Sequence, residues 1–168
     1  MDLFILRHGE AGKKLAAGNK DFDRPLTVTG QKEVVDIAKS LKDLGIKFDF
    51  ILSSPLKRAH QTAAIVAKTF KNEKKMEDWD ELKPEGNRLD LYRKLSSRFK
   101  QQSSVLIVGH EPYLTDMIGE MIFDGKGGTV VLKKAGLARI EANSSSSPKL
   151  HGQLKWLLTP KHMKNMAK

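Results

Sequence analysis

The sequence predicts an α/β protein, a three-layer α/β/α sandwich built around a mainly parallel mixed sheet. Short apolar runs alternate with stretches of helical period along most of the 168 residues. This alternation favours parallel strands that are covered by helices on both faces. Two of the runs, Leu3–Leu6 and Val105–Val108, are apolar at every position, which is typical of strands buried on both sides. The length suits one core, so we expect a single domain over residues 1–168.

Each expected helix has a recognisable beginning or end. Gly45 would end the first helix, and Ser54 with Pro55 would begin the second with a capping hydroxyl and a proline. Asn87 can cap the third helix, and Pro112 opens the fourth. The first helix is expected from about Thr29 to Leu44, with one apolar face formed by Val34, Ile37, Ala38 and Leu41, and the second from Ser54-Pro55, with a buried side formed by Ala59, Ala63, Val66 and Phe70. The third is expected from Asn87, with Leu91, Leu95 and Phe99 facing inward. The fourth is expected from Pro112, with Leu114, Met117, Ile118 and Met121 at helical spacing.

The remaining apolar segments are expected to be strands. Val105–Val108 should be a central strand because it is apolar throughout. The other expected strands are Phe48–Leu52, a short edge strand at Met76–Leu82, and three in the tail at Gly128–Leu132, Gly136–Ala142 and Gly152–Leu158. Asn143–Pro148 is too polar for a core and is expected to be a flexible connection.

Composition narrows the class of function. The formal net charge is +10, but seven of the 30 basic residues are arginine, and the lysines are spread along the whole chain. This pattern favours a solvated surface over a specific nucleic-acid interface, with attraction of an anionic substrate or partner as the alternative. The chain has no cysteine, which excludes disulfides and thiolate chemistry. No apolar run approaches the ~20 residues that span a bilayer, so we expect a cytoplasmic protein.

Three short motifs carry the residues with chemical potential. They are Leu6-Arg7-His8-Gly9-Glu10, Ser54-Pro55-Leu56-Lys57-Arg58-Ala59 and Gly109-His110-Glu111-Pro112. Each follows an expected strand, and the carboxyl ends of parallel strands are where open α/β sheets bind ligands. The motifs would converge if the strand order brings these ends together.

Together these motifs resemble the histidine phosphatase superfamily, which has the phosphoglycerate-mutase-like fold. The resemblance runs from Met1 to about Pro160. Within the superfamily, the short form without cap insertions looks most like the SixA-type phosphohistidine phosphatases. Asp23-Arg24-Pro25-Leu26-Thr27 and Glu81-Leu82-Lys83-Pro84-Glu85-Gly86 are similar to that subgroup. The resemblance implies that the three strand ends meet at one site.

Phosphoryl transfer needs a nucleophile and positive charge around the phosphoryl oxygens. His8 is the candidate nucleophile, with its pKa lowered by neighbouring positive charge. Arg7 and Arg58 would clamp the phosphoryl group through their planar guanidinium groups, and His110 would add a donor. Taken singly, each residue also has a structural interpretation. His8 or His110 could be a hydrogen-bonded strand-end residue, Arg7 could cap a helix or pair with Asp21 or Asp23, and Arg58 could be solvated like Lys57.

The remaining candidates are less specific. Glu81 lies in the region where the mutase branch has the glutamate that protonates the leaving oxygen, and otherwise is a solvent-facing edge carboxylate. Arg24 is a candidate for the rim of the phosphate site, whereas Asp21 and Asp23 are interpreted as loop acids. Gly30 would permit close approach of the first helix to the sheet. We expect no metal and no cofactor, because no carboxylate cluster has metal-ligand spacing.

The first functional hypothesis is a phosphatase that removes phosphate from phosphohistidine on a signalling protein. A second is a phosphatase acting on polyphosphate or a small phosphate ester, which the +10 charge would favour. A third is a non-catalytic phosphate-binding module, although such a module has no use for a nucleophilic histidine. None of these hypotheses requires a specific nucleic acid or a membrane.

Overall fold

A mixed sheet forms the middle layer of the molecule, as the sequence predicts, and it has six strands among the described residues. The computed structural model describes residues 1–13, 21–123, 130–143 and 149–166. Four neighbouring strands are parallel, and the last two in the chain pair antiparallel at one edge. The order across the sheet is β3 (Met76–Asp78), β2 (Phe50–Ser53), β4 (Ser104–Gly109), β1 (Asp2–Arg7), β5 (Leu137–Asn143) and β6 (His151–Leu158).

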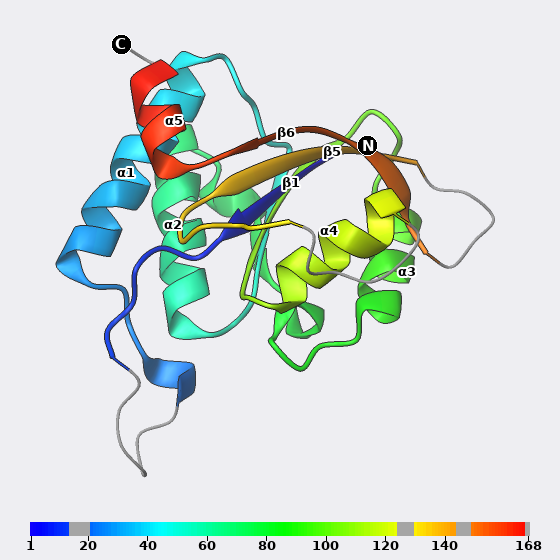
Figure 1. Cartoon of the computed structure of the whole chain (residues 1–168), viewed down its shortest axis with the longest axis horizontal. Helices are drawn as coiled ribbons and strands as arrows, with labels where there is room; N and C mark the ends of the chain where they lie inside the picture. The colour runs from blue at the N-terminus through cyan, green and yellow to red at the C-terminus, as the bar shows by residue number, and fades with distance from the viewer. Residues whose placement is uncertain (14–20, 124–129, 144–148, 167–168) are drawn as a thin grey trace.

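Helices cover both faces of this sheet. Figure 1 shows one group on the left, formed by α1 (Val28–Asp43), α2 (Lys57–Phe70) and α5 (Pro160–Met166). A second group, formed by α3 (Arg88–Arg98) and α4 (Tyr113–Phe123), lies on the opposite face. The two apolar clusters between these layers are the two halves of the core. The three-layer α/β/α architecture is therefore confirmed.

The central strands contribute side chains to both halves of the core. In β1, Leu3 and Ile5 belong to the cluster beneath α3 and α4, whereas Phe4 and Leu6 belong to the cluster beneath α1 and α2. All four side chains are buried, and burying such a side chain is worth about 1.5–3 kcal/mol. Strict two-residue alternation thus fixes the register of β1, because a slip by one residue would exchange the two faces.

Two of the expected helix signals, Asn87 and Gly45, are confirmed. The Asn87 side chain accepts two backbone N–H groups at the start of α3. At the start of α1, the Thr27 hydroxyl accepts the Gly30 N–H as the N-cap. Gly45 follows the end of α1 with φ of 76°, a conformation that glycine adopts without strain.

The expected start of α2 at Ser54-Pro55 is wrong. The helix begins at Lys57, after an N-cap residue, Leu56, that makes no side-chain capping bond. The Ser54 hydroxyl instead lies 2.8 Å from Nε2 of His110. The same hydroxyl also accepts the Leu56 N–H at 3.4 Å, so it contacts both the turn before α2 and a distant part of the chain.

Other expected elements differ in extent. The edge strand β3 ends at Asp78 and is followed by the 3-10 helix η3 (Asp80–Leu82), so the expected strand over Met76–Leu82 is only half formed. Of the strand expected at Gly128–Leu132, the described part, residues 130–132, is not a strand. The expected connection at Asn143–Pro148 lies largely outside the described residues. The helix α5 was not expected. The other 3-10 helices are η1 (Asp21–Asp23) and η2 (Glu73–Lys75).

No helix among the described residues combines the length and the apolar character that crossing a bilayer requires.

The first turn of α1 packs directly on the backbone that follows β1. A Cβ atom added to Gly30 would lie 2.2 Å from the carbonyl oxygen of Glu10 and 2.9 Å from its nitrogen. Alanine normally stabilises a helix relative to glycine by about 1 kcal/mol. Here the clash with backbone atoms reverses that preference.

We therefore expect Gly30→Ala to lower the free energy of unfolding by about 1–3 kcal/mol, in the range of overpacked sites. Urea denaturation of the purified protein would measure this change. Gly12→Ala is the matched control, because a Cβ atom at Gly12 meets nothing within 4 Å. Equal stability of the two variants would contradict the close approach.

Candidate active site

The three motifs meet at the carboxyl edge of the sheet. The register pairs Arg7 of β1 with Gly109 of β4, and Ser53 of β2 with Val108 of β4. The strands therefore end side by side, and the next residues along each chain segment, His8, Ser54 and His110, are neighbours. Backbone bonds from His8 N to the Gly109 carbonyl, and from Ser54 N to the Val108 carbonyl, continue the pairing.

His8 is held in one tautomer. Its Nδ1 lies 2.7 Å from the Gly9 carbonyl oxygen, and a carbonyl can only accept, so Nδ1 carries the proton and donates it. The neutral ring then has its lone pair on Nε2. The Nε–H group of Arg58 donates to this Nε2 over 3.3 Å. The lone pair of a buried, neutral imidazole thus faces a guanidinium group.

Burial is the largest influence on His8. The side chain is 8% exposed, and desolvation lowers its pKa to about 4. The bond to the Gly9 carbonyl opposes this shift, whereas the positive charges of Arg58, Arg7 and Arg24 add to it. The expected direction is found, although burial rather than neighbouring charge is the main cause.

His110 lies beside His8 and is even less exposed. The two ring centroids are 5.2 Å apart, and His110 is 2% exposed. Burial lowers the pKa of His110 to about 3, and the positive charge of Arg58 contributes in the same direction. Its Nε2 is bonded to the Ser54 hydroxyl, while its buried Nδ1 has no hydrogen-bond partner among the described residues. His110 is therefore a neutral ring whose Nδ1 atom makes no hydrogen bond with the described residues.

Arg58 is buried in the first turn of α2 rather than solvated, with 4% of it exposed. The Thr62 hydroxyl bonds to the Arg58 carbonyl and accepts the Gly9 N–H at 3.1 Å. This link ties the helix that carries Arg58 to the loop that carries His8. The Nη1 and Nη2 groups of Arg58 bond to Asp21 at 2.8 and 2.9 Å.

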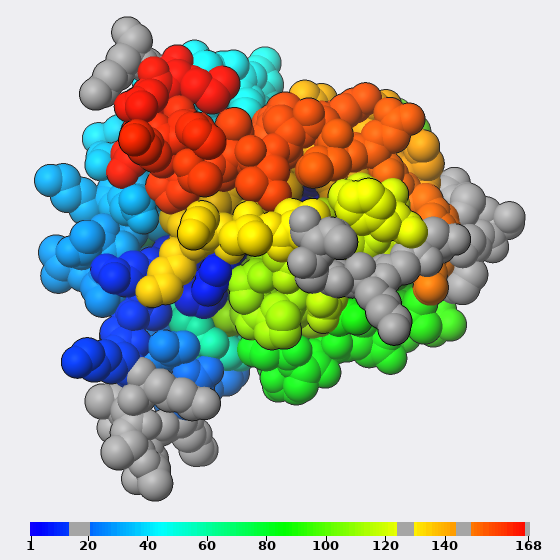
Figure 2. Space-filling model, in the orientation of Figure 1, coloured from blue at the N-terminus to red at the C-terminus, as the bar shows by residue number. Residues whose placement is uncertain are grey.

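Arg7 approaches the site from the end of β1. Its Nη1 donates to the Leu132 carbonyl oxygen at 2.9 Å, and its buried Nε has no partner among the described residues. The segment that contains Leu132 also bonds to the backbone of Arg7 and His8. In Figure 2 this segment, coloured yellow, lies against the dark blue surface of the first residues.

Arg24 and Asp21 form the neighbouring rim. The Nε atom of Arg24 lies 3.0 Å from Oδ1 of Asp21, and its Nη1 donates to the Gly12 carbonyl at 3.1 Å. The charge of Arg24 also contributes to the lowered pKa of His8. The interpretation of Asp21 as a simple loop acid is wrong, because its carboxylate joins Arg24 to Arg58. Asp23 on the same turn is exposed.

Glu81 is not brought together with these residues. It lies in η3, and both oxygens of its carboxylate accept from the Lys94 ammonium group, at 2.9 and 3.0 Å. Among the described residues, no hydrogen bond joins this carboxylate to His8, Arg58 or His110. The carboxylate is therefore paired with Lys94 and is not a free edge group.

The sequence pattern missed two acidic residues near the site. Asp21 is one of them, and its role depends on a long-range contact that no local pattern encodes. Glu111 is the other: it is half-buried, accepts from the Thr115 hydroxyl at 2.6 Å, and has its pKa raised by burial. Its place directly after His110 in the third motif was a signal that could have found it. Within the described residues, no group of three or more histidine or acidic side chains could hold a metal ion.

Comparisons with known proteins agree with this geometry. A family model of the histidine phosphatase superfamily (branch 1) matches residues 3–87. An uncharacterised protein of Picosynechococcus sp. is 34% identical, over 94% of this chain and 99% of its own length. The structure of the protein histidine phosphatase SixA, complexed with tungstate, has a TM-score of 0.83 and is 27% identical, covering 98% of this chain and 100% of that chain.

A shorter match points the same way. A broad-specificity phosphatase of Saccharomyces cerevisiae is 40% identical over 42% of this chain, but the match spans only 31% of the yeast protein. The family model covers half of the chain, and the matched half includes Arg7, His8 and Arg58. The chain therefore belongs to the histidine phosphatase superfamily, and this membership supports phosphatase activity through a phosphohistidine-type mechanism.

Proposed function

We propose that this protein removes the phosphoryl group from phosphohistidine on another protein. His8 carries the phosphoryl group after it leaves the substrate and before water hydrolyses it. One observation carries the proposal. The Nε2 lone pair of a neutral, buried His8 faces Arg58, and the His110 ring lies 5.2 Å away between centroids. A nucleophile and its positive surroundings are thus assembled before any substrate binds.

In the first step, Nε2 of His8 attacks phosphorus and the P–N bond of the substrate breaks. The electron pair of that bond leaves with the substrate imidazole. The Nε–H of Arg58 then donates its hydrogen bond to a phosphoryl oxygen. It can no longer donate to Nε2 of His8, because that lone pair now binds phosphorus. Arg7 supplies further positive charge, and the free Nδ1 of His110 is available if it carries the ring proton. The Gly9 carbonyl keeps accepting from Nδ1, which supports the positive charge that develops on the His8 ring.

In the second step, water attacks the phosphorus of phosphorylated His8. The P–Nε2 bond breaks, the electron pair returns to Nε2, and the phosphate leaves with the protons of the water, which it exchanges with solvent. Arg58 and Arg7 again bear the charge of the phosphoryl oxygens. Because burial keeps the free His8 ring neutral, the enzyme returns directly to its reactive form.

The expected acid Glu81 is bonded to Lys94, and the half-buried Glu111 is bonded to Thr115, which favours a phosphohistidine substrate over an ester. An alkoxide leaving group needs a proton at the oxygen that departs, but the Glu81 carboxylate is bonded to Lys94. An imidazole leaving group has a second ring nitrogen, which solvent can protonate before the P–N bond breaks. The reaction then needs no acid placed at the breaking bond.

The shape of the molecule also favours a large substrate. The segment between Leu82 and β4 forms α3, and Leu91 and Leu95 of this helix are buried in the core beneath the sheet. This segment is therefore part of a structural layer and does not form a lid over the strand ends. A site that this segment leaves uncovered suits a phosphorylated side chain presented by a folded partner.

A phosphatase for polyphosphate or a small phosphate ester is the second candidate. The formal charge of +10 favours it, because a positive field attracts polyanions and raises their rate of encounter. The two candidates place different demands on the leaving group, so their substrates separate them.

The direct test compares kcat/KM on a peptide phosphorylated at histidine with kcat/KM on a matched phosphoserine peptide and on polyphosphate. We expect the phosphohistidine peptide to be favoured over the phosphoserine peptide by about 100-fold or more, the value of one general acid. Phosphate release, corrected for spontaneous hydrolysis, measures the rate on each of the three substrates.

Higher kcat/KM on the phosphoserine peptide or on polyphosphate would support the second candidate. His8→Ala is expected to abolish turnover, and turnover that survives would contradict the mechanism. Binding without turnover by the natural protein would indicate a phosphate-binding module.

Arg58 and Lys57 provide a matched pair for the clamp. They are adjacent in α2, but Arg58 is buried against His8 and Lys57 is exposed. Arg58→Ala should lower kcat by at least ~100-fold, the usual loss for one donor to developing charge. Lys57→Ala should change kcat by less than about two-fold, because it removes only an exposed charge. Similar losses in the two variants would exclude the proposed role of Arg58.

The protonation of His8 sets the acid limit of the reaction. Because the pKa of His8 is lowered to about 4, Nε2 stays available as the pH falls below 6.5 and is lost only as the pH passes through about 4. An NMR titration of the His8 ring, assigned by its absence in His8→Asn, would measure this directly. A midpoint near the ordinary histidine value of about 6.5 would show that the ring is not desolvated as the structure implies.

A further inference from the structure

We propose that Asp21 is a positioning residue for the reaction, and that it acts by fixing the orientation of the Arg58 guanidinium group. This inference rests on the proposed function, because it assigns a role relative to the phosphoryl group on His8. The observation behind it is a set of three bonds made by one side chain.

The three nitrogens of the Arg58 guanidinium have separate partners. Nη1 donates to the backbone carbonyl of Asp21 at 2.8 Å, and Nη2 donates to its Oδ2 at 2.9 Å. Nε donates to Nε2 of His8 at 3.3 Å. Because the guanidinium group is planar, two contacts at one end fix the direction of the third N–H. Asp21 thus aims the Nε–H of Arg58 at the atom that will carry the phosphoryl group.

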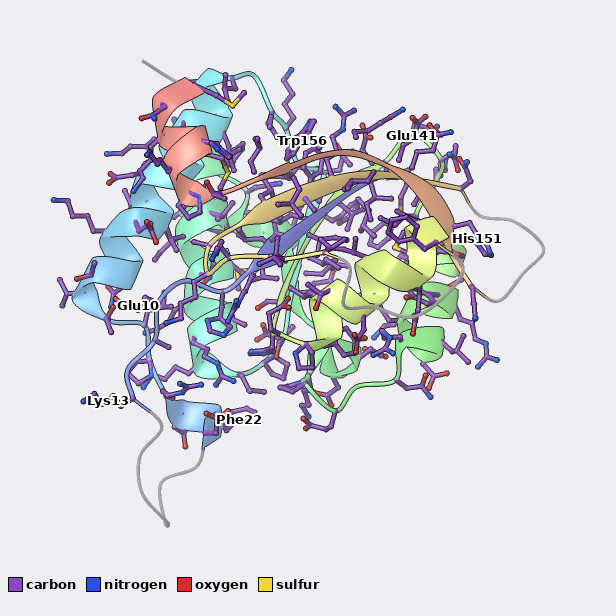
Figure 3. The ribbon with its side chains drawn as sticks, in the orientation of Figure 1. Glu10, Lys13, Phe22, Glu141, His151 and Trp156 are labelled. Carbon is purple, nitrogen blue, oxygen red and sulfur yellow. The ribbon has the colours of Figure 1, made fainter. Side chains whose placement is uncertain are left out.

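Asp21 itself is held by a second arginine. Oδ1 of Asp21 lies 3.0 Å from Nε of Arg24, whose Nη1 reaches the Gly12 carbonyl at 3.1 Å. The carboxylate therefore bridges Arg24 and Arg58. Figure 3 labels Phe22, the next residue of η1, and shows this turn below the first turn of α2.

The charge of Asp21 offsets the cost of burying Arg58. Burial lowers the pKa of Arg58 and the nearby Arg24 lowers it further, whereas the charge of Asp21 and its hydrogen bond raise it. A long, flexible cation that is only 4% exposed needs such a partner to remain both charged and ordered.

The contact could in principle be inhibitory, with Asp21 taking the place of a phosphate. The geometry favours positioning. Asp21 engages Nη1 and Nη2 and leaves Nε directed at His8. Each Nη carries a second N–H, for which the described residues provide no hydrogen-bond partner. A phosphoryl oxygen can therefore bond to Nε and to one Nη without displacing the carboxylate. The two interpretations predict opposite effects of removing the charge.

The test is a double-mutant cycle with a matched control, in which kcat and kcat/KM are measured on the phosphohistidine peptide. Asp21→Asn should lower kcat by about 10- to 100-fold in the natural background, a loss typical of a misplaced catalytic group. Asp23→Asn makes the same change of charge on the same turn at an exposed residue, and should alter kcat by less than about two-fold. In an Arg58→Ala background, Asp21→Asn should have less than about two-fold further effect, because a residue that acts through Arg58 has nothing left to position.

Each alternative has its own outcome. An equal loss from Asp21→Asn with and without Arg58 would overturn the inference, because a general disturbance of the fold acts in both backgrounds. A rise in kcat/KM would overturn it in favour of inhibition, and equal effects of Asp21→Asn and Asp23→Asn would also overturn it. If the natural protein leaves the phosphohistidine peptide intact, the proposed function itself fails. An active natural protein with an unaffected Asp21→Asn variant overturns only the role of Asp21.

Discussion

The parallel register of β1, β4 and β2 is the constraint on which the site depends. Arg7 pairs with Gly109 and Ser53 pairs with Val108, so the three strands end level with one another. Residues separated by about fifty positions in the chain then become neighbours. The register is maintained by apolar side chains that alternate between the two halves of the core. A slip of one residue in β1 would reverse its buried faces and also move His8 away from His110. Packing energy thus protects the geometry of a polar site that contributes little packing of its own.

Burial disfavours the charged form of each ionisable group at the end of these strands, and the histidines and Arg58 respond in different ways. The two histidines lose their protons, with pKa values lowered to about 4 and about 3. Arg58 cannot lose its proton in the same way, because the guanidinium pKa is too high, and it is paired with Asp21 instead. The site therefore holds two neutral imidazole rings beside retained positive charge. The free-energy cost of removing water from these cations belongs to folding, so it does not oppose the binding of an anion. This preorganisation is the main source of transition-state stabilisation in many enzymes.

The parts of the structure that could be predicted from the sequence are those encoded by local pattern. The apolar runs predict β1 and β4, the periodic stretches predict the buried faces of α1 to α4, and the three motifs predict that His8, Arg58 and His110 lie together. Failures occur where a distant contact competes with a local preference. Ser54 has the chemistry of a helix cap, but its hydroxyl is bonded to His110. Glu81 lies at a suitable place in the chain, but the turn η3 and Lys94 direct its carboxylate elsewhere. The short helix α5 has little periodicity, and its Met163 is buried against the cluster beneath α1 and α2.

Asp21 illustrates the limit of sequence patterns most clearly. Asp21 and Asp23 occupy the same short turn and have the same side chain, yet the first bonds to Arg24 and Arg58 and the second is exposed. Only the direction in which each carboxylate leaves the turn distinguishes them. Thr27 caps α1 with its hydroxyl and bonds to the Glu10 backbone, and so fixes the chain shortly after the turn. The close packing of Gly30 on Glu10 holds the same junction. The orientation of Arg58 is thus set by two layers of support, a carboxylate that holds its guanidinium group and a helix start that holds the chain next to that carboxylate.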